Sequence, residues 1–290
     1  MTVITNLISR NLKLYFRDRT SVFFSLLGVL IIIGLYVLFL GNLIVKNLEG
    51  FVTVSARFTV DSWIMAGVLA VTTVTTTMGA YGAMVEDRSR KISRDFSSAP
   101  VKRSQLAAGY ILSSFIIGVI MTVAALVIAE IYIIAYGGKP LGLIPLLKIL
   151  GLILLSVLAN SSFLFLVVSF FRTTSAFATA STILGTLIGF VAGIYVQIGI
   201  LPVALQTLIK IFPISHVGLL MRRVMMEAPM SSAFAGAPAE VVDNFKKTMG
   251  AVFYFGEKQI IPIVSILIIA GAGILFYILA VIRISIKRKN

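Results

Sequence analysis

Cysteine is absent from the 290 residues, and His216 is the single histidine. The missing thiols exclude a disulfide framework, a thiolate metal site and a cysteine nucleophile, and one histidine cannot supply a multi-histidine metal site. The sequence also has no G-x-x-x-x-G-K-[ST] phosphate loop, no H-E-x-x-H motif and no nucleophile elbow. We therefore expect no enzyme activity, no resident metal and no cofactor bound by this chain.

Charge is scarce as well. Charged residues make up 12% of the chain and hydrophobic residues 59%, and the mean hydropathy is +1.04. This composition is typical of an integral membrane protein with several spans. The net charge of +14 comes from basic residues clustered beside apolar runs, which favours anionic membrane lipid over nucleic acid as the partner.

Long apolar runs predict an all-α polytopic membrane protein with six transmembrane helices, because a helix needs about 20 apolar residues to cross a bilayer. Residues 1–21 precede the first span. They place apolar side chains at helical spacing, with Arg10, Lys13 and Arg17 on another face, as in an amphipathic helix at the membrane interface; the alternative is that they are the first turns of the first span. The predicted spans are residues 22–45, 60–85, 106–136, 143–170, 176–198 and 260–282.

Residues 199–258 break this pattern, because their two apolar segments, Leu201–Phe212 and Ile214–Met226, are too short to cross a bilayer. Pro213 separates the two segments. They predict a re-entrant or interfacial helical hairpin, followed by a loop over Pro229–Gly256. If the amino terminus is cytoplasmic, fifteen of the 25 basic residues fall inside, so the positive-inside rule predicts that both termini are cytoplasmic.

The polar segment Glu86–Gln105 is a dense group of charges between the second and third predicted spans. It holds six basic and three acidic residues, and the same rule makes it cytoplasmic. Ile92 and Phe96 share one side of a predicted short helix from about Asp87 to Phe96. Such a helix could insert its apolar pair into a groove on a partner protein, or the segment could be a solvated loop anchored at the lipid surface.

Polar and small residues inside the predicted spans are the other candidates. Thr73, Thr76 and Thr77 suit either helix packing or a substrate cavity, and Asn160 is a further candidate for the substrate pathway. Glu130 should be protonated, paired or facing water; we expect it to pair with Lys148 or Arg57, or else to contact a cationic substrate. Three glycines spaced four apart predict close helix contact, either within the subunit or between subunits: Gly185, Gly189 and Gly193.

The order of these elements resembles the permease subunit of ABC-2 type exporters over essentially the whole chain. The most specific similarity is the run from Glu86-Asp87-Arg88 to Ser98-Ala99-Pro100-Val101, and Phe212-Pro213-Ile214 is similar to the family's proline-containing segment. Many members have Gly-Thr where this chain has Lys91-Ile92. The resemblance implies that the polar segment is a coupling helix that docks on a separate ATP-binding subunit, which carries ATP and Mg²⁺. The implied contact residues are Glu86, Asp87, Arg88, Arg90, Lys91, Ile92, Arg94, Phe96 and Pro100.

The resemblance further implies two permease copies, identical or related, in a bacterial cytoplasmic membrane. The expected function is ATP-driven export of amphiphilic small molecules, such as drugs, antibiotics, peptides or lipid-like compounds, by alternating access. One alternative is export of a polysaccharide or teichoic acid, which should require aromatic side chains that stack on sugars. The other is a membrane scaffold or sensor without a transport cycle.

Overall fold

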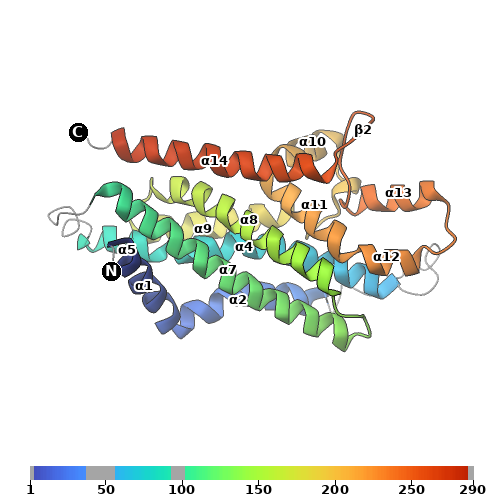
Figure 1. Cartoon of the computed structure of the whole chain (residues 1–290), viewed down its shortest axis with the longest axis horizontal. Coiled ribbons are helices and arrows are strands. Elements are labelled where there is room, and N and C mark those ends of the chain that lie inside the picture. The colour runs from blue at the N-terminus through green and yellow to red at the C-terminus, as the bar shows by residue number, and fades with distance from the viewer. Residues whose placement is uncertain (1–2, 37–55, 93–101, 287–290) are drawn as a thin grey trace.

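The structure, a computed structural model, describes residues 3–36, 56–92 and 102–286, and these residues are almost entirely helical (Figure 1). Within the described ranges the strands are two, of two residues each, and they pair antiparallel with Tyr254 opposite Gln259. The elements in chain order are α1 (Val3–Arg17), α2 (Arg19–Leu35), α4 (Ala56–Ala80), α5 (Gly82–Ser89), α7 (Arg103–Ala135), α8 (Leu143–Val168), α9 (Thr174–Val191), η2 (Ile198–Ile200), α10 (Val203–Ile211), α11 (Pro213–Met225), α12 (Glu227–Ala233), α13 (Ala239–Thr248), β1 (Tyr254–Phe255), β2 (Lys258–Gln259) and α14 (Pro262–Ile286).

Helix α4 forms the core, and α2, α7, α8, α9 and α11 all pack against it. Nearly every residue of α4 is buried, including all of its threonines except Thr75. The threonine hydroxyls are satisfied within the helix: Thr72 donates to the Val68 carbonyl, Thr76 to Thr72 and Thr77 to Thr73, at 2.6–2.7 Å. Because the hydroxyls need no outside partner, a helix rich in threonine can lie in an apolar interior.

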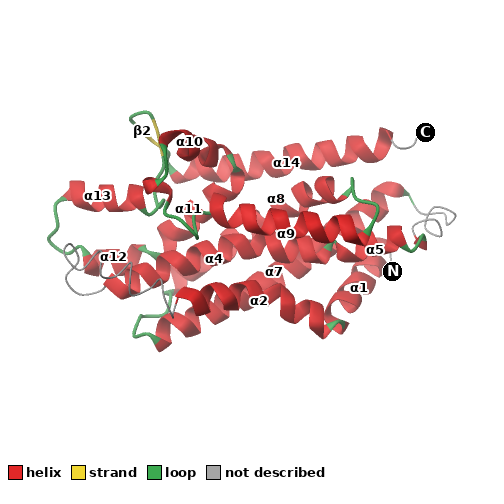
Figure 2. Cartoon of the chain, turned by 180° about the vertical axis from the view of Figure 1, so that it is seen from behind, coloured by secondary structure: helices red, strands yellow, loops and turns green. Residues whose placement is uncertain are grey.

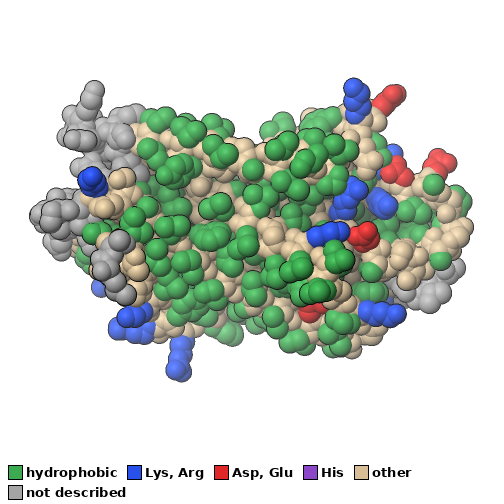
Figure 3. Space-filling view, in the orientation of Figure 1, with side chains coloured by type: hydrophobic (Ala, Val, Ile, Leu, Met, Phe, Trp, Pro, Cys, Tyr) green, Lys and Arg blue, Asp and Glu red, His purple; other side chains and the backbone are tan. Residues whose placement is uncertain are grey.

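Five helices in the described ranges are long and apolar enough to cross a membrane: α4 with α5, α7, α8, α9 and α14. A sixth is possible if α10 and α11, which meet at an angle of 94°, count as one span. Hydrophobic side chains cover the middle of the molecule, and the charged side chains gather toward its two ends (Figure 3). The chain is therefore an all-α integral membrane protein.

The two ends of the molecule differ in what they carry. The start of α1, the end of α14 and α5 lie at one end, and α12, α13 and the hairpin lie at the other (Figure 1). Seen from behind, α2 and α9 flank α4 (Figure 2). We call the end with α5 the α5 end, and the opposite end the α13 end.

Several predicted boundaries differ from the structure. The helix predicted over 60–85 begins at Ala56 and is interrupted at Tyr81, and the helix predicted over 176–198 ends at Val191, where Gly193 takes a left-handed backbone (φ 67°) that a helix cannot continue. The expected loop over Pro229–Gly256 contains α13 and the last five residues of α12. Residues 37–45 of the first predicted span lie outside the described residues.

Candidate functional site

The polar segment begins on a helix that ends earlier than the sequence predicts. Helix α5 stops at Ser89, and Lys91 adopts a left-handed backbone (φ 64°). The prediction of one continuous helix from Asp87 to Phe96 is therefore wrong, because a residue in this conformation cannot continue a right-handed helix. Glycine is the residue that tolerates this φ best, and this chain has Lys91 there. Arg94, Phe96 and Pro100 lie outside the described residues.

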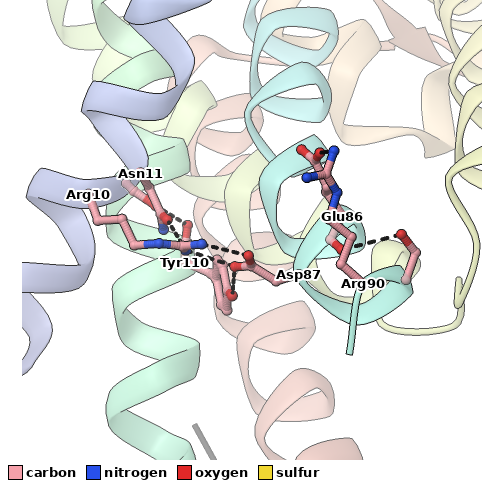
Figure 4. A network of polar contacts seen from close by, with 8 residues as sticks. Arg10, Asn11, Glu86, Asp87, Arg90 and Tyr110 are labelled. Atoms are coloured by element: carbon pink, nitrogen blue, oxygen red, sulfur yellow. Dashed lines mark hydrogen bonds and ion pairs between the residues drawn. The ribbon is translucent and has the colours of Figure 1, made fainter. Parts of the chain in front are cut away.

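A buried ion pair fixes the root of the polar segment (Figure 4). Asp87 is 3% exposed and accepts two hydrogen bonds from the Arg10 guanidinium of α1, at 2.6 and 2.8 Å. The Tyr110 hydroxyl of α7 donates to the same carboxylate at 2.6 Å. Beside it, Asn11 donates to Ser113 of α7 at 3.0 Å. These five residues, which we call the Asp87 cluster, join α1, α5 and α7.

The hydrogen bond to Asp87 is also the main cause that raises the pKa of Arg10. A bidentate, charge-assisted pair of this kind fixes orientation as well as distance. The carboxylate predicted to contact an ATPase is thus already used within the chain. Its role is to hold the segment rather than to present a free charge.

The other charges of the segment separate into buried and exposed groups. Arg88 is partly buried and donates to the backbone carbonyls of Val168 and Phe171, at 3.1 and 3.3 Å, at the C-terminal end of α8, where the helix dipole favours a cation. Glu86 and Arg90 form an exposed pair at 2.7 Å. Lys91 is exposed and Ile92 half-buried. The exposed group is therefore the part of the described segment that a partner could contact.

The threonines predicted to line a substrate pathway do not face a cavity in the described structure. Thr73, Thr76 and Thr77 are fully buried. Asn160 of α8 donates to the Thr73 hydroxyl at 2.9 Å, which joins α8 to α4. The hydrogen bonds of these polar residues are made inside the helix or between helices.

A groove of about 780 Å³ instead runs between α2, α4 and α9. None of the described residues that line it carries a charge. Its polar lining consists of hydroxyl groups, and the remainder is mainly aliphatic. The groove lining includes Ser25, Thr72, Thr75, Met78, Ser181 and Thr182.

At the α5 end a second cavity of about 500 Å³, which we call the vestibule, adjoins the groove. Tyr15, Gly79 and Phe177 line both cavities, so the two are adjacent. The vestibule lies between α1, α5 and the start of α9, and its lining carries charges of both signs. These charged residues are Arg10, Arg17, Asp18, Glu86, Asp87 and Arg90.

Glu130 lies at the α13 end of α7 and does not form either of the ion pairs that we expected. Its carboxylate accepts a hydrogen bond from the Leu141 backbone at 2.8 Å, while Arg57 pairs with Asp61 at 3.0 Å. The sequence reasoning missed Asp61, which is 1% exposed. The sequence signal that could have identified Asp61 is its spacing of four residues from Arg57, which places both side chains on one helix face.

The three spaced glycines have different surroundings. An added Cβ on Gly185 would meet nothing within 4 Å, so this glycine is not a site of helix packing within the chain. It lines the groove instead. Gly189 lies against the ring of Tyr195, and Gly193 lies against Ile198. The surroundings of the three glycines differ because α9 is at the edge of the bundle, so one end of its glycine face is open.

Comparison with known families gives one finding. Residues 47–282, most of the chain, match the family described as ABC-2 family transporter protein. No curated protein matches the chain. The matched range includes the polar segment, the groove walls α4 and α9, and the bent pair α10–α11. The chain belongs to the ABC-2 transporter family and is a permease component, the part of such a transporter that is embedded in the membrane.

Proposed function

We propose that the chain is the permease of an ATP-driven exporter of amphiphilic small molecules in a bacterial cytoplasmic membrane. The adjacency of the vestibule and the groove carries this proposal. The vestibule offers both signs of charge, and the groove offers hydroxyls and apolar side chains without charge. A molecule with a polar head and an apolar body matches this sequence of surfaces.

In this proposal the α5 end faces the cytoplasm, together with both termini. The polar segment docks on a separate ATP-binding subunit through its exposed residues Glu86, Arg90 and Lys91 and through the half-buried Ile92. The Asp87 cluster then carries displacement of the segment to α1 and α7, because a buried bidentate pair resists bending at its root. Two permease copies and two ATP-binding subunits complete the assembly.

A sugar-containing cargo is the second candidate, favoured by three aromatic side chains on the groove lining, Tyr15, Phe177 and Tyr195. The two candidates differ in what should stimulate ATP hydrolysis. Amphiphilic drugs or peptides should act under the first, and lipid-linked saccharides under the second. Suppose that replacing Phe177 and Tyr195 with leucine abolishes stimulation by saccharides but not by drugs or peptides. That result would favour the second candidate.

Charge reversal of the three exposed residues Glu86, Arg90 and Lys91 tests the docking. The permease is purified with the ATP-binding subunit expressed from the same operon, reconstituted in liposomes and assayed for ATP hydrolysis with a compound panel. We expect the Glu86→Lys, Arg90→Glu and Lys91→Glu triple variant to lose the ATP-binding subunit during purification. Lys258→Glu, an exposed change at the α13 end, is the control. If the triple variant retains a stimulated ATPase, or if no ATP-binding subunit purifies with the parent, the proposal fails.

The test of the groove uses the absence of cysteine. Single cysteines at Thr75 and Thr182, which both line the groove, should react with a maleimide, and a stimulating compound should slow that reaction. A cysteine at Leu154, an exposed α8 residue outside the groove lining, should react at the same rate with and without the compound. Equal slowing at all three positions would indicate a nonspecific effect on the membrane.

A further inference from the structure

Arg222 of α11 is completely buried and has no acidic partner among the described residues. The next residue, Arg223, is exposed. An arginine inside a membrane protein without a counterion is costly, so its surroundings should account for its presence. The other two deeply buried ionised groups, Asp61 and Asp87, both have an arginine partner.

The Arg222 guanidinium joins the end of α9 to α4. Its Nη2 donates to the backbone carbonyls of Ala192 and Gly193, at 2.6 and 2.8 Å, just after α9 ends. These carbonyls carry the negative end of the helix dipole, which favours a cation. On its other side the guanidinium lies over the Trp63 ring of α4, 5.2 Å from the ring centroid.

Glycines make room for this side chain. A Cβ on Gly67, Gly193 or Gly250 would come within 3.1–3.3 Å of the guanidinium nitrogens. Gly193 and Gly250 also have φ of 67° and 66°, so two separate requirements select glycine there. The indole of Trp63 donates to the Met249 carbonyl at 2.7 Å, beside Gly250. The space that encloses the Arg222 side chain is thus built from α4, α11, the end of α9 and the turn after α13.

Helix α9 also contacts α4 and α5, but it buries few of its own residues. Within it only Ile188 and Gly189 are buried, and both lie in the last turn, next to the carbonyls that Arg222 holds. The same helix forms one wall of the groove. A wall with so few buried residues can change its position if the bonds at its end are released.

We infer that Arg222 is a positioning residue that locks the α13 end of α9 against α4 and α11, so that the groove opens toward the α13 end only when the bonds to Ala192 and Gly193 break. This inference rests on the proposed function, because it assigns a moving wall to the exporter. Within the described residues, Nε and Nη1 of Arg222 have no hydrogen-bond partner. A guanidinium has five N–H donors, so unused donors are available to other carbonyls after α9 moves.

The first experiment measures access to the groove. A cysteine at Gly185, where an added side chain meets nothing, is labelled from outside intact cells with a membrane-impermeant maleimide. Arg222→Met, which keeps volume but removes every donor, should raise the labelling rate by about tenfold or more, because a hydrogen bond from a charged group is worth at least that factor. Arg223→Met is the matched control and should leave the rate unchanged. An unchanged rate in folded Arg222→Met protein overturns the inference.

The second experiment keeps Arg222 and therefore does not depend on how its variants fold. A Cβ on Gly218 would lie 3.4 Å from the Ala192 carbonyl, so cysteines at 192 and 218 can be joined by a short thiol cross-linker that contains a cleavable disulfide. Cross-linking should abolish stimulated ATP hydrolysis and transport, and reduction should restore both. Persistent transport in the cross-linked protein contradicts the inference. In a protein whose ATP hydrolysis no compound stimulates, the cross-link could still slow labelling of the cysteine at Gly185, and reduction could restore it. That result would support the lock and count against the exporter.

Discussion

Removing the charge of Asp87 tests whether the Asp87 cluster holds the root of the polar segment. Breaking a fully buried ion pair by removing one partner costs about 3–5 kcal/mol. Here the Arg10 side chain is 32% exposed and that of Asp87 is 4% exposed, so water recovers part of the lost interaction on the Arg10 side. We therefore expect Asp87→Asn to lower the free energy of unfolding by about 2–3 kcal/mol.

The assay is a double-mutant cycle of Arg10→Gln and Asp87→Asn, with unfolding followed by titration of denaturing detergent into mixed micelles. A buried bidentate pair should give a coupling energy of about 2 kcal/mol. The internal control is Glu86→Gln with Arg90→Gln, since the side chains of that pair are 50% and 69% exposed. For an exposed i,i+4 pair on a helix we expect about 0.3–0.5 kcal/mol.

The result that refutes the reasoning is a coupling energy for Arg10 and Asp87 no larger than that of the control pair. The cluster would then be a surface contact, and it could not transmit displacement of the polar segment. A second readout separates stability from transmission. At a temperature where Asp87→Asn remains folded, compound-stimulated ATP hydrolysis should fall while binding of the ATP-binding subunit persists.

Three further predictions concern single positions. Lys91→Gly should raise the unfolding free energy by roughly 0.5–1 kcal/mol, because glycine relieves the left-handed backbone of φ 64°; an unchanged or lower value in the same detergent titration would mean that the turn is not formed. Gly118→Leu should abolish folding as judged by gel filtration, since even a Cβ would lie 2.6–2.7 Å from side chains of α4 and α8, whereas Gly185→Ala should be tolerated, since nothing lies within 4 Å; equal tolerance would contradict the packing of α7. Lys247 hydrogen-bonds Asp243 and lowers its pKa, so the carboxylate form is favoured in the folded state and its stabilisation is lost as pH falls through that lowered pKa; the hydrogen-exchange protection factors of the Ala239–Thr248 amides should fall below the usual pKa of aspartate, and Asp243→Asn should remove this pH dependence.

The amino-acid sequence by itself determined the class of the protein. Apolar runs longer than a bilayer is thick must form helices, because unpaired backbone groups are too costly in lipid. The same sequence placed charges between the runs, which predicts the ends of the molecule. It also carried the family resemblance, which rests on the order of these elements and on a few motifs.

Only the tertiary structure decided the role of residues that are neighbours in the chain. Successive residues of a helix point about 100° apart, so Asp87 is buried against Arg10 while Glu86 faces water. In the same way Thr72 and Thr75 line the groove, whereas Thr73 does not, and Arg222 is enclosed while Arg223 is exposed. Composition and motif are the same for both members of such a pair. Which face a helix presents is set by the helices packed around it, and those contacts join residues far apart in the sequence.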